Sequence, residues 1–514
     1  MSRRHPKQKR LSPFTPADLQ HRCCVAPSPE LRERIRERLR GLNDAPGLGV
    51  GGRIVVQPQK RPGFNDGLII PGTEYPLGTP LRTVRRAAAS RAPLRGTVRV
   101  IIVLVDFTDA PMAAPPDHFR DLFFSTRKIP TGSVREYFTE ASHGLLTLSG
   151  EVVGPYRLPR TLAAYAGGKA GTDNPEPNAR TMARDAAKLA NPAVNFAPYD
   201  NDRNGFVDAF IVVHAGRGAE ETGNENHIWS HKWVLTGGPL NADGTRIFGY
   251  LTIPEDSKIG VCAHELGHLL FGWPDLYDTD GSSEGLGNWC LMGGGSWNGN
   301  GDIPSHPSAW CKVNQGWVSV VNRTTNGTVT IKDVKSDYKV HRLWRNGSPG
   351  REYFLLENRQ RTLYDRKLPG EGLLVFHVDE AIDGNDDENH PFIKLLEADG
   401  LNDLHDGTSR GDPGDPYPGR SKNVTLSNAS NPNAKSYGGV NTCVTVTNIG
   451  ATLGSMTARL GVRCSSASGP APGSMRKRKK ATQRPSATRS ARKRAPVKKQ
   501  AKKPGAARRG ARRR

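Results

Sequence analysis

The chain has 514 residues, too many for one ordinary domain, and its length predicts two or three. Its formal net charge of +23 comes mostly from residues 476–514, which hold 19 Lys or Arg and no acidic residue. The remainder carries 54 basic against 50 acidic residues, so its charge does not indicate a polyanion-binding surface. No run of 18 apolar residues occurs, which argues against a transmembrane helix, and no conventional secretory signal is visible.

The first 95 residues are interpreted as a prosegment-like region. Residues 28–42 predict an amphipathic helix that Ser28 caps. Its apolar stripe needs a partner surface and consists of Leu31, Ile35, Leu39 and Leu42. Residues 43–95 are rich in Gly, Pro and Arg and are typical of an extended linker or prosegment.

Strands and helices alternate over residues 96–318, which predicts an α+β domain. The apolar runs 98–107 and 206–216 are typical of buried strands. Residues 133–142 predict a helix with a capping box of Ser133 and Glu136, and residues 178–190 predict another helix. Residues 145–158 alternate and predict a hairpin. We expect this domain to pack a helix that carries an HExxH motif, described below, under a twisted sheet.

The character changes after residue 318. Strand-like runs separated by Gly, Asn and Asp predict a β-rich domain over residues 319–464, with runs at 328–334, 338–344, 352–358, 370–380 and 443–449. Residues 465–514 contain almost no large apolar side chains and predict a disordered basic tail. Seven sparse cysteines do not form a disulfide framework. Cys443 and Cys464 could pair, but buried free thiols are the favoured interpretation.

The segment CAHELGHLLFGWPDLYD at 262–278 carries the chemistry. On a helix, His264 and His268 share one face, and two neutral imidazoles there can bind one zinc ion. Glu265 can then take a proton from a zinc-bound water, whose pKa zinc lowers to about 7. A chance HExxH is the alternative, and the apolar helix and the glycines around the motif weigh against it.

The third zinc ligand is predicted from the residues on the C-terminal side of the motif. In metzincins a glycine and a His or Asp occur there at fixed spacing; here Gly272 and Asp275 each come one residue late. The helix therefore ends one residue later or bulges at Phe271. Asp275 is the first choice, Asp278 the second, and Glu284 would imply a glutamate-type zincin; Asp275 as a turn cap is the structural alternative. Met292, in NWCLMGGGSW, is the candidate Met-turn methionine.

These motifs resemble the immune-inhibitor-A-type zinc metallopeptidases, which are metzincin-like. Six further segments carry the resemblance in the expected order: VLVDFTD (103–109), VREYFTEASHGLLTLSGEVVGPYRLP (134–159), DNDRNGFVDAFIVVHAG (200–216), NHIWSHKW (226–233), SAWCKVNQGWV (308–318) and PGEGLLVFHVDE (369–380). The resemblance implies a secreted endopeptidase with a prosegment, a zinc catalytic domain and a β-rich domain. It implies that His264 and His268 are ligands and Glu265 the catalytic acid/base.

Two acidic loops are candidate calcium sites. Asp200, Asp202, Asn204 and Asp208 occupy positions 1, 3, 5 and 9 of a loop, but position 12 is Ile211, so the loop is not an EF-hand. An Asx-rich turn is the alternative. The second loop is more typical of a polar surface loop, and its acids are Asp399, Asp403, Asp406, Asp412 and Asp415.

The N-terminal cysteines and the tail leave further alternatives. A thiolate of Cys23 or Cys24 could hold zinc and keep an enzyme latent, although ordinary thiols are favoured. The tail, which lacks aromatic residues, could bind nucleic acid or acidic surfaces, or only aid solubility. Two functions follow: an active zinc endopeptidase acting on proteins or peptides, which is favoured, and an inactive peptidase fold that binds polyanions through its tail.

Overall fold

The computed structural model describes residues 25–43, 93–173 and 175–464, with only the backbone for residues 38–43. The basic tail and Cys23 and Cys24 lie outside these ranges, as does most of the prosegment-like region. The expectations for those parts stay predictions. Helix α2 (Pro29–Asn43) is described, and its first turn is capped as expected, because the Leu31 amide donates to Ser28 Oγ at 3.2 Å.

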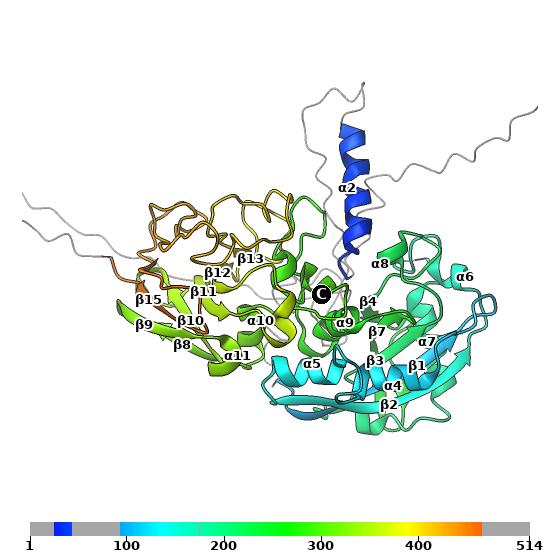
Figure 1. Cartoon of the computed structure of the whole chain (residues 1–514). Coiled ribbons are helices and arrows are strands. Elements are labelled where there is room, and N and C mark those ends of the chain that lie inside the picture. The colour runs from blue at the N-terminus through cyan, green and yellow to red at the C-terminus, as the bar shows by residue number, and fades with distance from the viewer. Residues whose placement is uncertain (1–24, 44–92, 174, 465–514) are drawn as a thin grey trace, which may run out of the picture. The chain divides into compact units, whose positions relative to one another are not determined.

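A five-stranded sheet organises the part before residue 255 (Figure 1). Its order is β2-β1-β3-β7-β4; β4 alone runs antiparallel to its neighbour, and the other neighbours pair in parallel. Both predicted buried strands belong to it, as β1 and β3. The bounds are β1 Gly96–Asp106, β2 Leu146–Arg157, β3 Phe210–His214, β4 His231–Val234 and β7 Gly249–Pro254.

The predicted hairpin at 145–158 is wrong. These residues form the single strand β2, which pairs with β1 in parallel from Gly96 opposite Leu146 onward. Gly150 does not make a turn. A Cβ at this position would lie 1.9 Å from the Val100 carbonyl oxygen, so glycine lets the two strands approach.

Helices pack against this sheet: α7 against β1 and β2, α4 and α5 against β2, and α9 against β7 and β4. The predicted helices 133–142 and 178–190 are confirmed as α5 and α7. The capping box of Ser133 and Glu136 is present, and Asn178 caps α7 in the same way. The bounds are α4 Pro116–Phe124, α5 Val134–Ala141, α6 Leu162–Ala166, α7 Ala179–Ala190, α8 Ala219–Thr222, α9 Ile259–Phe271 and α10 Ala309–Asn314.

Short elements connect these helices and strands. A small antiparallel pair joins β5 (Leu240–Ala242) to β6 (Thr245–Ile247). Single turns of 3-10 helix are η2 Ala197–Tyr199, η3 Gly287–Trp289, η4 Gly294–Trp297, η5 Arg345–Gly347 and η6 Leu363–Lys367.

The part after residue 318 is β-rich, as predicted. One sheet has the order β13-β12-β11-β10-β8, and a second has the order β14-β15-β9. The bounds are β8 Ser319–Arg323, β9 Gly327–Lys332, α11 Val334–Asp337, β10 Lys339–Trp344, β11 Glu352–Arg359, β12 Gly372–Asp379, β13 Ile393–Leu395, β14 Thr445–Thr447 and β15 Ser455–Gly461. The favoured interpretation of free thiols at Cys443 and Cys464 is wrong, because the two form a disulfide with Cα atoms 4.8 Å apart.

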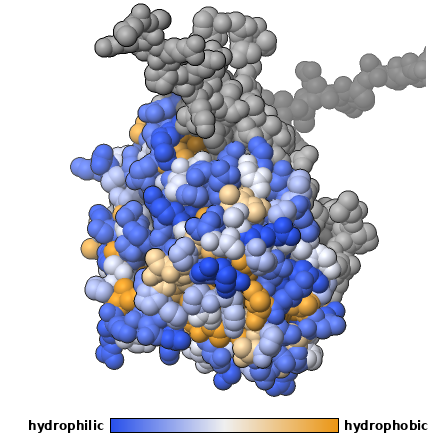
Figure 2. Space-filling view, turned by 90° about the vertical axis from the view of Figure 1, so that its right-hand side faces the viewer, coloured by the Kyte–Doolittle hydropathy of each residue, from blue (hydrophilic) through white to orange (hydrophobic). Residues whose placement is uncertain are grey.

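The main apolar core extends from the first sheet into the β-rich part. It includes Ile102 of β1 and Leu266 of α9 together with Leu355 of β11 and Phe376 of β12. A smaller core lies between the two sheets of the β-rich part. The face in Figure 2 is mainly hydrophilic, with hydrophobic residues interspersed. Among the described residues, no helix is long and apolar enough to cross a membrane.

Candidate metal centre

Helix α9 holds both motif histidines, and all of its residues are buried. It continues to Phe271 without a bulge and ends at Gly272, whose φ of 65° lies in the left-handed region. Gly272 and the next residue, Trp273, donate their amides to carbonyls of the last turn. The extra residue before the glycine therefore lengthens the helix, and the chain then turns back toward the histidines.

Three side-chain atoms converge beside α9. Asp275 Oδ1 lies 3.1 Å from His264 Nε2 and 3.2 Å from His268 Nε2, and the two nitrogens are 3.1 Å apart. The three side chains are almost completely buried. Four tetrahedral zinc bonds of about 2.0–2.1 Å would separate neighbouring donor atoms by roughly 3.4 Å. The spacing of the three atoms therefore fits one zinc ion.

The second nitrogen of each imidazole shows why a cation belongs here. His264 Nδ1 lies 3.0 Å from the Leu291 carbonyl oxygen, and His268 Nδ1 lies 2.6 Å from that of Trp273. If each Nδ1 carries its proton and donates it, each neutral ring presents a bare lone pair at Nε2. Two lone pairs and a carboxylate then face one another, and this arrangement repels unless a cation lies between them. The donor set of two imidazoles and one carboxylate suits zinc.

Glu265 lies next to His264 on the same helix and is fully buried. Neither of its carboxylate oxygens has a hydrogen-bond partner among the described residues. Burial and the nearby charge of Asp275 raise the pKa of Glu265 well above its ordinary value. A carboxylate with free oxygens beside a cation site is suited to accept and return a proton.

Met292 packs against the helix turn that separates the histidines. A Cβ at Gly267 would lie 2.6 Å from Met292 Sδ, so glycine makes room for the thioether. The Met292 carbonyl also accepts the Leu276 amide at 2.7 Å, which holds the chain next to Asp275. Met292 thus helps to position the cluster, because its side chain packs against the helix turn and its carbonyl binds the residue next to Asp275.

The two alternative third ligands lie in other environments. Asp278 accepts hydrogen bonds from the Ser282 hydroxyl and the Ser283 amide, both at 2.7 Å. Glu284 forms salt bridges with Arg32 and Arg36 of α2. Of the three acids weighed from the sequence, the structure brings only Asp275 into the cluster with both histidines.

The loop at 200–208 gathers part of its predicted set. One oxygen from each of Asp200, Asp202 and Asp208 falls within 4.8 Å of the others. Backbone amides already bind these acids: Gly205 donates to Asp200 at 2.9 Å. Asn204 uses its Oδ1 to accept the Phe206 amide at 2.9 Å. The geometry suits both a cation loop and the alternative of an Asx-rich turn.

An N-terminal segment reaches the site, which the sequence pattern does not predict. The Val25 carbonyl accepts the Trp229 indole N–H at 2.9 Å, and the Ala26 carbonyl accepts that of Trp297 at 2.6 Å. The Val25 amide donates to the Ser230 carbonyl at 3.3 Å and lies close enough to Glu265 to lower its pKa slightly against the larger effect of burial. Both tryptophans lie in recognisable motifs, but spacing alone does not reveal what they bind.

Comparison with known proteins covers the part of the chain that holds this cluster. Residues 94–320 match the family model of the immune inhibitor A peptidase M6 catalytic domain. Pre-pro-metalloprotease PrtV of Vibrio cholerae serotype O1 (strain ATCC 39315 / El Tor Inaba N16961) is 34% identical over 270 residues, which are 42% of this chain and 29% of that protein. Immune inhibitor A of Bacillus thuringiensis subsp. alesti is 34% identical over 197 residues, 32% of this chain and 28% of that protein. The chain thus spans less than a third of the length of these curated relatives.

Proposed function

We propose that this chain is a zinc-dependent endopeptidase that hydrolyses peptide bonds of proteins, because residues 94–320 match the family model of the immune inhibitor A peptidase M6 catalytic domain. The observation that carries the proposal is the convergence of His264 Nε2, His268 Nε2 and Asp275 Oδ1 within 3.2 Å beside the helix that also carries the buried Glu265. This set suits metal-assisted hydrolysis of a carbonyl substrate.

In this proposal His264, His268 and Asp275 hold the metal. Zinc supplies a Lewis acid that lowers the pKa of water and polarises the scissile carbonyl. The Leu291 and Trp273 carbonyls fix the rings so that both Nε2 atoms point to one place. Glu265 takes the proton of the attacking water and passes it to the leaving amine.

The test replaces Glu265 by Gln, which keeps the size of the side chain and removes its basicity. We expect casein cleavage to fall by about 10²–10⁴-fold while about one zinc per chain remains bound. Glu371→Gln, at an exposed carboxylate of the β-rich part, is the matched control and should cleave like the wild type. Undiminished cleavage by Glu265→Gln would rule out the proposed role, and loss of zinc would point to a ligand.

The N-terminal region is proposed to be a prosegment that blocks this site, because residues 25–36 lie on the elements that surround it. Val25 and Ala26 are buried against Trp229 and Trp297 beside Glu265. Farther along, Arg32 Nε lies 3.0 Å from Glu284 Oε2. Both side chains are less than 10% exposed, so this ion pair fixes the start of α2 (Figure 1).

Removing the segment should therefore raise activity. We expect cleavage of the chain within residues 44–92 to release inhibition once residues 25–43 dissociate. Arg32→Ala should increase the activity of the uncleaved chain, because it breaks the ion pair with Glu284. Arg34→Ala is the matched control, since its guanidinium donates to the Glu221 carbonyl in an exposed position. Equal activity of intact chain, cleaved chain and Arg32→Ala would contradict the prosegment.

The remaining parts of the proposal concern organisation and location. We propose a prosegment over 1–95, a catalytic domain over 96–318, a β-rich domain over 319–464 and a basic tail over 465–514. The Cys443–Cys464 disulfide supports secretion, because such bonds persist in oxidising compartments. Calcium at Asp200, Asp202 and Asp208 is also proposed. Asp202→Asn should then abolish any calcium-dependent rise in melting temperature that this loop provides.

A further inference from the structure

A second group of three carboxylates lies in the β-rich part, far along the chain from the histidines. Glu397 and Asp399 follow strand β13, and Asp415 comes from a Pro- and Gly-rich loop. One oxygen from each lies within 4.8 Å of the others. Glu397 and Asp415 are only 2% and 1% exposed. Glu397 stands just outside the acidic segment that the sequence singled out, so sequence reasoning missed it.

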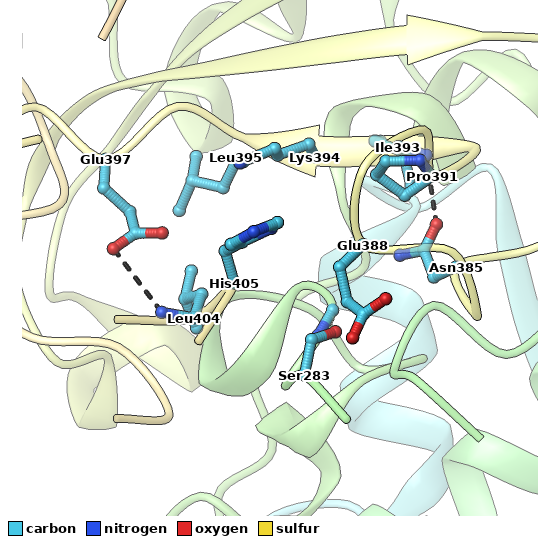
Figure 3. Close-up of a pocket in the computed structure, with 11 residues that line it drawn as sticks. Ser283, Asn385, Glu388, Pro391, Ile393, Lys394, Leu395, Glu397, Leu404 and His405 are labelled. Carbon is cyan, nitrogen blue, oxygen red and sulfur yellow. Dashed lines mark hydrogen bonds between the residues drawn. The ribbon is translucent and has the colours of Figure 1, made fainter. Parts of the chain in front are cut away.

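Glu397 is the member of the group whose bonding is incomplete. Its Oε1 is buried and has no hydrogen-bond partner among the described residues. The carboxylate accepts a long bond at Oε2, 3.4 Å, from the Leu404 amide, which Figure 3 shows as a dashed line, and the Asp403 backbone also donates to it. A buried carboxylate oxygen without a partner is costly, and within the described ranges no lysine or arginine forms an ion pair with any of the three acids.

Neutral donors hold the other two acids in place. Asp415 Oδ2 accepts the Trp289 indole N–H at 2.7 Å, and Asp399 Oδ1 accepts the Leu401 amide at 3.1 Å. Gly414 lies so close that a Cβ there would be 1.9 Å from Asp399 Oδ2. The carboxylates are therefore positioned before any ligand arrives. The neutral donors do not compensate their mutual repulsion, which the charge of nearby Lys394 offsets only in part.

The dimensions and chemistry of the group select the ligand. Calcium binds oxygen at 2.3–2.6 Å, so two oxygens on one ion are at most about 5 Å apart. The three oxygens meet this limit. An all-carboxylate set without nitrogen or sulfur favours a hard cation over zinc.

We propose that Glu397, Asp399 and Asp415 bind one calcium ion. The ion fixes the conformation of the 397–415 loop, which contacts the segment that precedes Met292. Two backbone bonds already join these parts: the Glu284 amide donates to the Leu404 carbonyl at 2.8 Å, and the Asn288 amide to the Arg410 carbonyl at 2.7 Å. Trp289 adds the side-chain link to Asp415. The ion thus stabilises a contact between the β-rich part and the candidate catalytic domain.

The experiment uses the full chain stripped of calcium. Terbium, a luminescent substitute for calcium, is titrated with excitation through tryptophan, because the Trp289 indole touches a proposed ligand. Calcium is then used to displace the terbium. Glu397→Gln should weaken binding at one site by more than about tenfold. Asp406→Asn, an acid of the same loop with a 62% exposed side chain, is the matched control and should bind like the wild type.

Thermal unfolding supplies a second readout. Calcium should raise the melting temperature of the wild type and of Asp406→Asn, and this rise should shrink in Glu397→Gln. In calcium-free buffer Glu397→Gln should be at least as stable as the wild type, because the change removes like-charge repulsion.

Two further variants keep the outcome decisive. Asp399→Asn replaces Glu397→Gln if the latter fails to fold, and Asp202→Asn removes the contribution of the 200–208 loop. The proposal would be overturned if both Glu397→Gln and Asp399→Asn bound terbium and calcium as tightly as the wild type. It would also be overturned if Asp202→Asn, which lacks the contribution of the 200–208 loop, bound no calcium at millimolar concentration.

Discussion

The carboxylate of Asp275 faces Nε2 of His264 and Nε2 of His268, so its charge is central to the proposed metal site. We predict that Asp275→Ala weakens zinc binding by at least about 10–100-fold, because it removes a charged ligand and not merely a supporting contact. Competition with a chromogenic chelator measures the affinity. Zinc binding unchanged from the wild type would exclude Asp275 as a ligand.

Asp278→Asn is the comparison for that prediction. The Asp278 carboxylate is occupied by Ser282 and Ser283, so this variant should keep zinc even if it loses some stability. A larger loss of zinc in Asp278→Asn than in Asp275→Ala would reverse the assignment of the third ligand.

Glu220 predicts a pH dependence of stability. Burial raises its pKa from 4.5 to about 7, while the Ser230 hydroxyl and amide partly oppose the shift. The folded state therefore holds a proton that the unfolded state has released between pH 4.5 and 7. Its contribution to stability falls as pH rises through this window, by on the order of 3 kcal/mol. Glu220→Gln removes the group that titrates, so the variant should gain stability relative to the wild type as pH rises from 4.5 to 7.

Urea unfolding of both proteins at several pH values measures the difference. Glu221→Gln, on the next residue and partly exposed, is the matched control. The assignment to Glu220 would be contradicted if the difference in unfolding free energy between the wild type and Glu220→Gln stayed constant with pH. It would also be contradicted if Glu221→Gln changed the pH dependence of the unfolding free energy by the same amount.

Individual site residues can be predicted only where local spacing constrains them. His264, Glu265 and His268 follow from one helical turn, and Asp275 follows from the chain reversal that Gly272 permits. Glu397 and Asp415 lie 18 residues apart on loops without a fixed period. Their meeting depends on packing against Trp289, which local spacing does not encode.

Elements with local signals can be predicted well. Helix α5 has a capping box at Ser133, and strand β1 is a long apolar run. Strand β2 is mistaken for a hairpin because the residues of β1 that pair with it lie about 50 positions earlier, from Gly96 opposite Leu146 onward. Alternation alone cannot distinguish such a parallel strand from two antiparallel strands. Strands β4 and β7 escape prediction, because they are short and their pairing depends on the whole sheet.

A buried ionic network joins α10 to β11 and predicts a stability defect. Arg359 makes two bonds to Asp365 and one, of 3.0 Å, to Glu357, whose other oxygen lies 2.8 Å from Lys312 Nζ. All four side chains are at most 2% exposed. Arg359→Met should destabilise the protein by about 3–5 kcal/mol, because it removes the cation that binds both buried carboxylates and leaves Glu357 with Lys312 alone and Asp365 with Lys335. Chemical denaturation measures the change in the free energy of unfolding.

Arg366→Met is the matched control for that network. Its guanidinium donates to the Leu363 carbonyl in an exposed position, so the change should cost less than about 0.5 kcal/mol. If Arg359→Met cost no more than this control, the network would not be a source of stability.

At the scale of the whole molecule, the proposed boundary at residue 318 separates parts that share a core. Leu355 and Phe376 of the β-rich part belong to the same buried cluster as Leu266 of α9. The rings of Trp310 and Phe392 lie 4.8 Å apart across the boundary. Composition predicts the β-rich character of the part after residue 318, but it cannot show that the two parts bury one another's apolar surface.

This shared core predicts that residues 94–320 do not fold alone. Their Lys312 would lose Glu357, and the apolar surface that β11 and β12 cover would be exposed. We expect the isolated fragment to lack near-ultraviolet circular dichroism and stoichiometric zinc, whereas residues 25–464 should unfold in a single calorimetric transition. A native-like, zinc-binding fragment 94–320, together with two separate transitions in the longer chain, would instead show that the catalytic and β-rich parts are independent domains.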